Sequence, residues 1–100
     1  MRLTSYEIAC IKEQATRYFG KDVKVHLFGS RTDDSKRGGD IDLFIQSYER
    51  QMLSVRNKIK FLAALKQQLG EQKIDVVLDN SAERRKTTFF QTISKYAVAL

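Results

Sequence analysis

The sequence predicts a small α/β domain of the α+β type, with helices packed on one face of a mixed sheet of about three to four strands. Apolar residues recur at helical spacing in some segments and alternate with polar residues in others, and glycines follow several of these segments. The predicted order is helix, strand, strand, helix, strand, helix. This order leaves the second face of the sheet available for a site.

The first half of the chain predicts one helix and two strands. Residues 4–7 read Thr-Ser-Tyr-Glu, which is the spacing of a capping box, and the apolar residues that follow predict a helix over 5–19. Alternating apolar residues predict strands over 23–28 and 40–45. Between them, residues 30–39 are rich in Gly, Asp, Ser and basic residues and predict a loop.

The second half predicts a helix, a strand and a last helix. A stripe of apolar residues that ends before Gly70 predicts the first of these helices. Its members are Met52, Val55, Ile59, Leu62, Leu65 and Leu69. Residues 73–79 alternate as a strand, and Ser81 can cap the last helix. The apolar positions of that last helix are Phe89, Phe90, Ile93, Ala97 and Leu100.

Length and composition predict a single folded domain over residues 1–100. The chain is 42% apolar and 30% charged, which excludes an intrinsically disordered protein, and its net charge of +6 favours anionic partners. Cys10 is the only cysteine, so the chain cannot form an internal disulfide and lacks the spacing of a zinc site. No stretch is apolar and long enough for a signal peptide or a membrane span, so we expect a soluble, cytoplasmic protein without a membrane partner.

Three aspartates are the candidate catalytic and metal-binding residues. Asp40 and Asp42 lie two residues apart on a predicted strand, so their side chains leave the same face. Asp75 points to the same polar face if its strand is a neighbour, because the residues that flank it are apolar. Carboxylates packed this closely repel one another unless a cation binds them. The pattern favours a divalent metal and two-metal transfer chemistry.

A candidate phosphate-binding loop follows the first strand. Gly29 has no side chain, which lets backbone N–H groups approach a phosphate, and the hydroxyl of Ser30 can donate a hydrogen bond. Arg31, Lys36 and Arg37 are close enough in sequence to add charged contacts. The loop therefore has the composition of an anion-binding site.

Each feature also has an ordinary structural interpretation. A Gly-Ser pair after a strand is often only a turn, an Asp-x-Asp pair is often a solvated edge, and Asp75 can be a solvent-facing residue. His26 is alone on its strand and fits a structural or surface role better than that of a base or ligand. Three lysines most simply form the solvated side of the long helix, namely Lys58, Lys60 and Lys66.

Taken together, three motifs resemble the polymerase β-like nucleotidyltransferase superfamily. They are Phe-Gly-Ser-Arg at 28–31, Gly-Gly-Asp-Ile-Asp-Leu at 38–43 and Lys-Ile-Asp-Val-Val at 73–77. The superfamily pattern is a Gly-Ser pair after a strand, an Asp-x-Asp on the next strand and a third acid on a later one, in this chain order. The short length resembles the minimal nucleotidyltransferases, or MNT proteins, which are encoded beside HEPN ribonuclease toxins.

The resemblance implies a role for each matching residue. Gly29 and Ser30 would bind the triphosphate of ATP, and Arg31 would be an auxiliary phosphate contact. Asp40 and Asp42 would bind both of two Mg²⁺ ions. Asp75 would complete the site and help to activate the acceptor hydroxyl. The chain departs from many relatives in having Gly39, where they have Ser before the first acid, which removes a possible hydroxyl contact.

The resemblance also implies a biological function, with two alternatives. The expected activity is that of an antitoxin that transfers AMP from ATP to a tyrosine hydroxyl of its HEPN toxin, in a complex of the two proteins. A second hypothesis is a non-catalytic antitoxin that neutralises the toxin by binding alone. A third is transfer to RNA or to a small molecule such as an aminoglycoside, and we rank it last because the domain is small.

Overall fold

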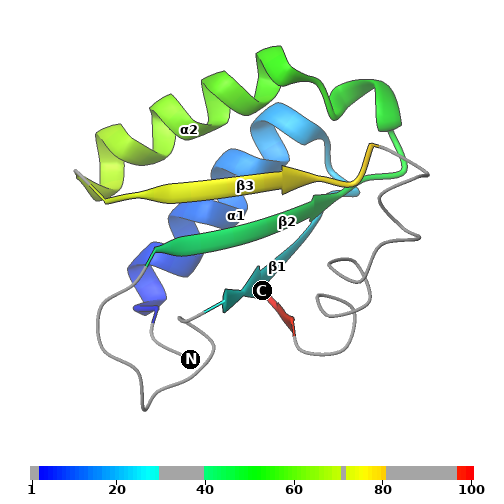
Figure 1. The fold of residues 1–100 in the computed structure, drawn as a ribbon. Coiled ribbons are helices and arrows are strands. Elements are labelled where there is room, and N and C mark those ends of the chain that lie inside the picture. The colour runs from blue at the N-terminus through cyan, green and yellow to red at the C-terminus, as the bar shows by residue number, and fades with distance from the viewer. Residues whose placement is uncertain (1–2, 30–39, 71, 81–96) are drawn as a thin grey trace.

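The computed structural model describes residues 3–29, 40–70, 72–80 and 97–100. Its elements follow one another along the chain in the predicted order up to the last strand (Figure 1). They are α1 (Ser5–Phe19), β1 (Lys24–Phe28), β2 (Ile41–Gln46), the 3-10 turn η2 (Arg50–Met52), α2 (Val55–Leu69), β3 (Ile74–Leu78) and β4 (Val98–Ala99).

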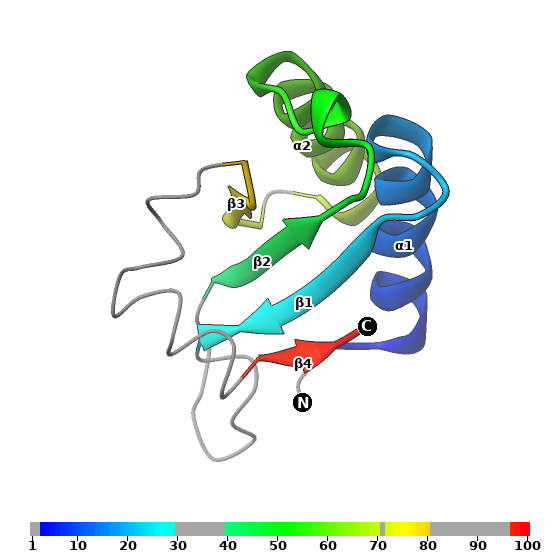
Figure 2. The same ribbon diagram turned by 90° about the vertical axis from the view of Figure 1, so that its right-hand side faces the viewer.

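The strands form one mixed sheet in the order β3-β2-β1-β4. β1 is antiparallel to both β2 and β4, whereas β2 and β3 are parallel and are connected through α2. A parallel pair requires such a crossover, and α1 and α2 lie together on one face of the sheet (Figure 2). The predicted fold class is therefore confirmed, including the placement of the helices on one face.

The hydrophobic core lies between this sheet face and the two helices. The inward residues of β1 and β2, such as Leu27 and Leu43, are fully buried. Across from them the rings of Phe19 on α1 and Phe61 on α2 meet edge to face, with centroids 5.2 Å apart. This core fixes the position of each strand and leaves the opposite sheet face for polar residues.

The first helix begins as predicted. The Glu7 N–H donates to Thr4 Oγ1 at 3.0 Å, and the Thr4 N–H donates to Glu7 Oε1 at 2.9 Å. These reciprocal bonds satisfy two N–H groups that the first helical turn leaves without a partner. The capping box is confirmed.

The second helix differs from the prediction in its start and in its buried side. It begins at Val55, because Ser54 is the N-cap and its hydroxyl accepts from the Asn57 N–H at 3.1 Å. The buried side centres on Phe61 and Leu65. Val55 and Ile59, two members of the predicted apolar stripe, are exposed by 67% and 61%. Only part of the predicted stripe is therefore buried, and Phe61, which lies outside that stripe, packs against Phe19 in the core.

The predicted last helix is wrong at its end, where the chain forms a strand. Val98 and Ala99 pair with Leu27 and His26 of β1, and the Leu100 N–H donates to the Val25 carbonyl at 2.9 Å. This pairing satisfies backbone groups along an edge of β1 that would otherwise lack partners. The rest of the predicted helix, over 81–96, lies outside the described residues.

The helices of the described residues are too short or too polar to cross a membrane.

Candidate active site

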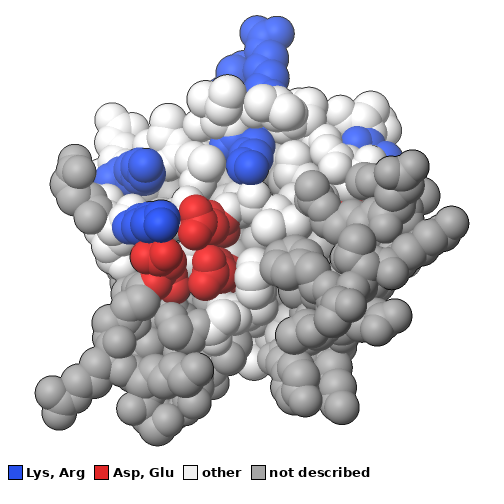
Figure 3. All heavy atoms as spheres, in the orientation of Figure 1, with Lys and Arg blue, Asp and Glu red and all other residues white. Residues whose placement is uncertain are grey.

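Two of the three predicted acids lie side by side on the open face of the sheet. Asp42 and Asp75 are direct partners in the parallel β2–β3 pair, and Asp40 lies just before β2. The Ile41 N–H donates to the Lys73 carbonyl at 3.1 Å and holds the strands in register at this point. Acidic side chains gather on the face opposite the helices, with basic side chains beside them (Figure 3). The sheet pairing thus brings Asp42 and Asp75 together as predicted, whereas the predicted convergence of all three acids is not seen among the described residues.

Repulsion among these acids changes the titration of the central one. Partial burial raises the pKa of Asp42 above its ordinary value of 3.8, and the negative charges of Asp75 and Asp40 raise that pKa further. A side-chain hydrogen bond with Asp75 acts in the same direction, whereas the Lys73 ammonium opposes the shift. Asp42 therefore experiences the negative charge of both other carboxylates.

Lys73 compensates only part of this charge. Its Nζ lies 3.4 Å from Asp40 Oδ2, but the two side chains are 72% and 39% exposed. An exposed pair of this kind contributes about 0 to 1 kcal/mol of stability. No salt bridge among the described residues includes Asp42 or Asp75, so within that part of the chain the two paired carboxylates have no cationic partner.

Gly29 ends β1 against the acids, in a backbone conformation that favours glycine. Its φ is +78°, in the left-handed region, and a Cβ at this position would overlap the carboxylate of Asp42. The partner of Asp42 across β1 is Phe28, the residue before this glycine. The missing side chain therefore makes room for the Asp42 carboxylate.

The donors at the site suit a hard divalent cation. Asp40, Asp42 and Asp75 offer only carboxylate oxygens, which are the ligands that Mg²⁺ prefers, and a cation relieves the repulsion that raises the pKa of Asp42. Among the described residues, no three Asp, Glu, His or Cys side chains already converge closely enough to hold an ion together. The donor chemistry of the acids thus fits a divalent metal, whereas their spacing does not form a group of three ligands.

The remaining predicted site residues lie outside the described part of the chain. These are Ser30 and Arg31, which were assigned to the triphosphate, and also Lys36, Arg37 and Gly39. Their roles stay predictions.

A polar network that the sequence analysis missed lies at the other end of the open face. His26 Nε2 lies 3.1 Å from Gln46 Oε1, and Gln46 Nε2 donates to Asp79 Oδ2 at 3.1 Å, which links three strands. His26 thus has the structural role that the sequence favoured. Asp79 is only 4% exposed, and Phe44, which follows Asp42 on the same face, is 3% exposed. Both side chains are therefore buried although they lie on the face opposite the helices.

A cavity of about 240 Å³ adjoins this network. Its lining is polar and includes side chains of both charges: Asp22, Lys24, Gln46, Ser47, Tyr48, Arg50 and Asp79. Gln46 gave a weak sequence signal, as a polar residue at the end of an apolar strand. The others come from the start of β1, from η2 and from the segments that adjoin β1, β2 and β3, and no local pattern brings them together.

We expect the network to contribute to stability and not to the chemistry at the acids. Replacing Gln46 with Ala removes one hydrogen-bond donor from the buried Asp79, and we expect the free energy of unfolding to fall by about 1 to 3 kcal/mol. The measurement is urea denaturation beside a matched control at the exposed Gln68, where Ala should change stability by less than about 0.5 kcal/mol. Equal effects at both positions would contradict a structural role for the network.

Paired acids beside a glycine turn are an arrangement that suits chemistry at phosphates. A family model for the nucleotidyltransferase domain matches residues 8–98, which include β1, β2, α2 and β3. No curated protein matches the chain. The chain therefore belongs to the nucleotidyltransferase domain family, within the polymerase β-like superfamily. Members of this family generally use a nucleoside triphosphate and a divalent metal ion.

Proposed function

We propose that this nucleotidyltransferase is an Mg²⁺-dependent protein adenylyltransferase, the antitoxin of a HEPN ribonuclease toxin, and that it transfers AMP from ATP to a tyrosine hydroxyl of that toxin. The observation that supports this most directly is the direct pairing of Asp42 with Asp75 beside Gly29. That arrangement places negative side chains, which repel one another, next to a backbone that a phosphate can approach. A metal-bound triphosphate would relieve the repulsion between the acids and place a phosphate next to this backbone, so its binding to such a site is favourable.

Each described residue has one role in the proposed reaction. Asp40 and Asp42 hold the metal, because they leave the same face of the chain and offer only oxygen ligands. Gly29 makes room for the Asp42 carboxylate, and we assign its backbone to the triphosphate. Asp75 faces the solvent from the edge strand and is accessible to an acceptor hydroxyl.

The proposed transfer is an in-line displacement at the α-phosphorus of ATP. The tyrosine oxygen forms a bond to that phosphorus, the bond from the phosphorus to the bridging oxygen of the β-phosphate breaks, and diphosphate leaves. The Asp75 carboxylate accepts the proton of the tyrosine hydroxyl. Bound Mg²⁺ supplies neutralisation of the triphosphate charge and lowers the pKa of the attacking hydroxyl.

Metal binding gives a prediction that does not depend on activity. We expect Mg²⁺ with a nonhydrolysable ATP analogue to raise the thermal midpoint of the wild-type protein by several degrees, because a ligand that binds only the folded state stabilises it. The same addition should leave the Asp42→Asn protein within about one degree of its own midpoint. Differential scanning fluorimetry measures both. An equal shift in the two proteins would place the ligand elsewhere on the molecule.

The proposed function is tested with the purified protein, ATP, Mg²⁺ and the protein encoded by the neighbouring gene, which we expect to be a HEPN toxin. We expect intact mass spectrometry to show the HEPN protein gaining the mass of one or more AMP units, and tandem mass spectrometry to place them on tyrosine. Asp42→Asn should give no gain. A stable complex without any AMP would instead support neutralisation by binding alone, and AMP on added RNA would support the nucleic-acid alternative.

A further inference from the structure

Two aliphatic side chains are exposed next to each other on α2. Val55 and Ile59 lie one helical turn apart and are 67% and 61% exposed. The core does not use them, since the buried side of the helix is that of Phe61 and Leu65. Single exposed aliphatic residues are common on protein surfaces, but an adjacent pair of this size on one side of a helix forms a small apolar patch.

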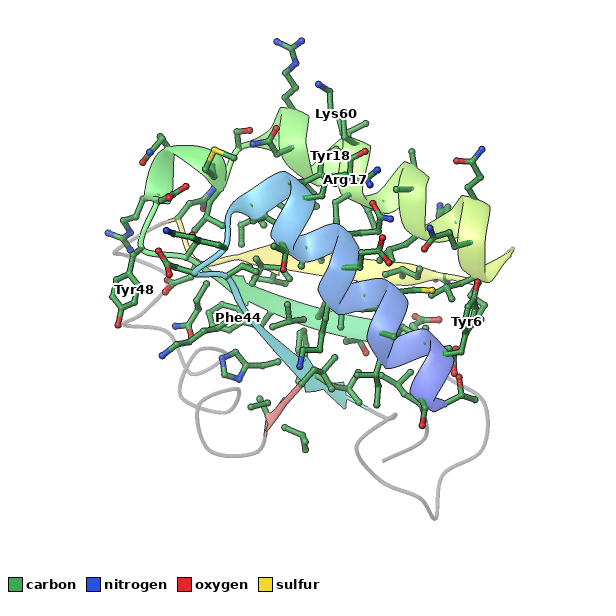
Figure 4. All side chains as sticks on the ribbon, turned by 180° about the vertical axis from the view of Figure 1, so that it is seen from behind. Tyr6, Arg17, Tyr18, Phe44, Tyr48 and Lys60 are labelled. Carbon is green, nitrogen blue, oxygen red and sulfur yellow. The ribbon has the colours of Figure 1, made fainter. Side chains whose placement is uncertain are left out.

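The same helix carries positive charge without any negative charge. Its cations are Arg56, Lys58, Lys60 and Lys66, and the chain has no acidic residue between Glu49 and Glu71. Arg56 and Lys60 are both exposed, and no salt bridge of the described residues includes either. Lys60 extends from α2 away from the body of the domain (Figure 4).

These charges destabilise the helix itself. Arg56 and Lys60 are four residues apart, so they are neighbours of like charge on the helix surface. The first turn also contains cations and no acid, whereas the positive end of the helix dipole favours acids there. Positions that break such local rules are expected at functional sites. The cationic start of α2 is therefore better explained by a partner than by the needs of the fold.

We propose that Val55, Arg56, Ile59 and Lys60, the basic face of α2, form the docking surface for an acidic amphipathic helix of a partner protein. An acidic helix complements the cations, and its apolar side can cover Val55 and Ile59, which would gain nothing against the phosphates of a nucleic acid. The proposal rests on the proposed function, because it locates the surface that holds the toxin. The acids lie on the opposite side of the sheet, so docking leaves them accessible.

Binding constants for charge-reversed variants test this surface. The probe is the same neighbouring-gene product as in the transfer assay, the expected HEPN toxin, and calorimetry measures its dissociation constant. We expect Arg56→Glu with Lys60→Glu to weaken binding at least about tenfold. The matched control, Lys12→Glu with Lys21→Glu, changes the net charge equally at exposed positions elsewhere and should weaken binding less than about twofold.

Unfolding of the variant cannot explain the expected loss. Glutamates in the first turns of α2 are favourable with the helix dipole, so the thermal midpoint of the charge-reversed protein should equal or exceed that of the wild type. A second variant, Val55→Ser with Ile59→Ser, keeps the charge and should also weaken binding, without altering its dependence on salt. Zero-length carbodiimide cross-linking should join Lys60 to a carboxylate of the partner.

Each outcome separates docking from catalysis. Asp42→Asn should bind the partner as the wild type does while transferring no AMP. Equal binding by the wild type and the charge-reversed protein, with AMP transfer retained, would overturn the docking surface and leave the proposed function intact. Failure of the wild type to bind the HEPN protein would overturn both. Binding of a short single-stranded RNA through Arg56 and Lys60, with toxin binding unaffected, would replace the protein partner with a nucleic acid.

Discussion

Replacing Asp42 with Asn is expected to reduce nucleotidyl transfer about a thousandfold or more and to raise the thermal stability of the metal-free protein. The loss of activity follows because metal coordination and charge neutralisation supply several kcal/mol to the transition state, and each 1.4 kcal/mol corresponds to about tenfold in rate. The gain in stability follows because the amide removes the charge that Asp75 and Asp40 repel. Single-turnover kinetics and thermal denaturation without metal measure the two effects.

The dependence of stability on pH gives a second readout of the same substitution. The pKa of Asp42 is raised in the folded state, so the folded protein binds its proton more tightly than the unfolded chain does. The resulting stabilisation is complete below the ordinary pKa of 3.8 and is lost as pH rises through the raised pKa. The Asp42→Asn protein should not lose this stabilisation as pH rises, because the amide does not titrate. A metal-free variant that is less stable than the wild type at neutral pH would contradict the repulsion.

Gly29→Ala is expected to disrupt both the fold and the site. The substitution places a Cβ in the space of the Asp42 carboxylate, at a φ of +78° that alanine rarely adopts. We expect a loss of about 2 to 4 kcal/mol of stability, since the backbone strain and the steric overlap add. Transfer should also fall, because the displaced carboxylate is a metal ligand in the proposed mechanism. Urea denaturation and single-turnover assays at low temperature separate the two effects.

Gly70→Ala is the matched control for this substitution. Gly70 has a φ of +85°, but no atom lies within 4 Å of the position of its missing Cβ. The backbone strain is therefore similar, at about 1 to 2 kcal/mol, and the overlap with the site is absent. Transfer by the folded Gly70→Ala protein should equal that of the wild type. Equal losses of stability and of transfer in the two variants would contradict a special role for the close contact between Gly29 and the Asp42 carboxylate.

The sequence predicted most of the fold because its signals are local. The capping box at Thr4 and the glycines at 20 and 70 gave the ends of α1 and α2, since caps depend on a few adjacent residues. The period-2 alternation around Asp42 and Asp75 gave the face of each strand. Once β2 and β3 are known to be neighbours, these faces place the two acids on the same side of the sheet.

The sequence could not predict features that depend on tertiary contacts. The rotation of α2, which exposes Val55 and Ile59, is set by the packing of Phe61 against Phe19. The strand at Val98–Ala99 forms because an edge of β1 is available, and its apolar residues also match a helical pattern. The network from His26 to Asp79 joins residues that only the sheet brings together.

The parallel pairing of β2 and β3 has a consequence for how the enzyme acquires its activity. Its strands are joined by the α2 crossover, and the hydrogen bond from Gln46 to Asp79 spans 33 residues. The entropy of closing so long a loop must be overcome before β3 can pair, so we expect contacts of this kind to form late in folding. Asp75 is therefore on a strand that pairs after the local elements have formed. Recovery of transfer activity during refolding should lag behind the formation of α1, β1 and β2, and a chain with only these three elements in place would be inactive.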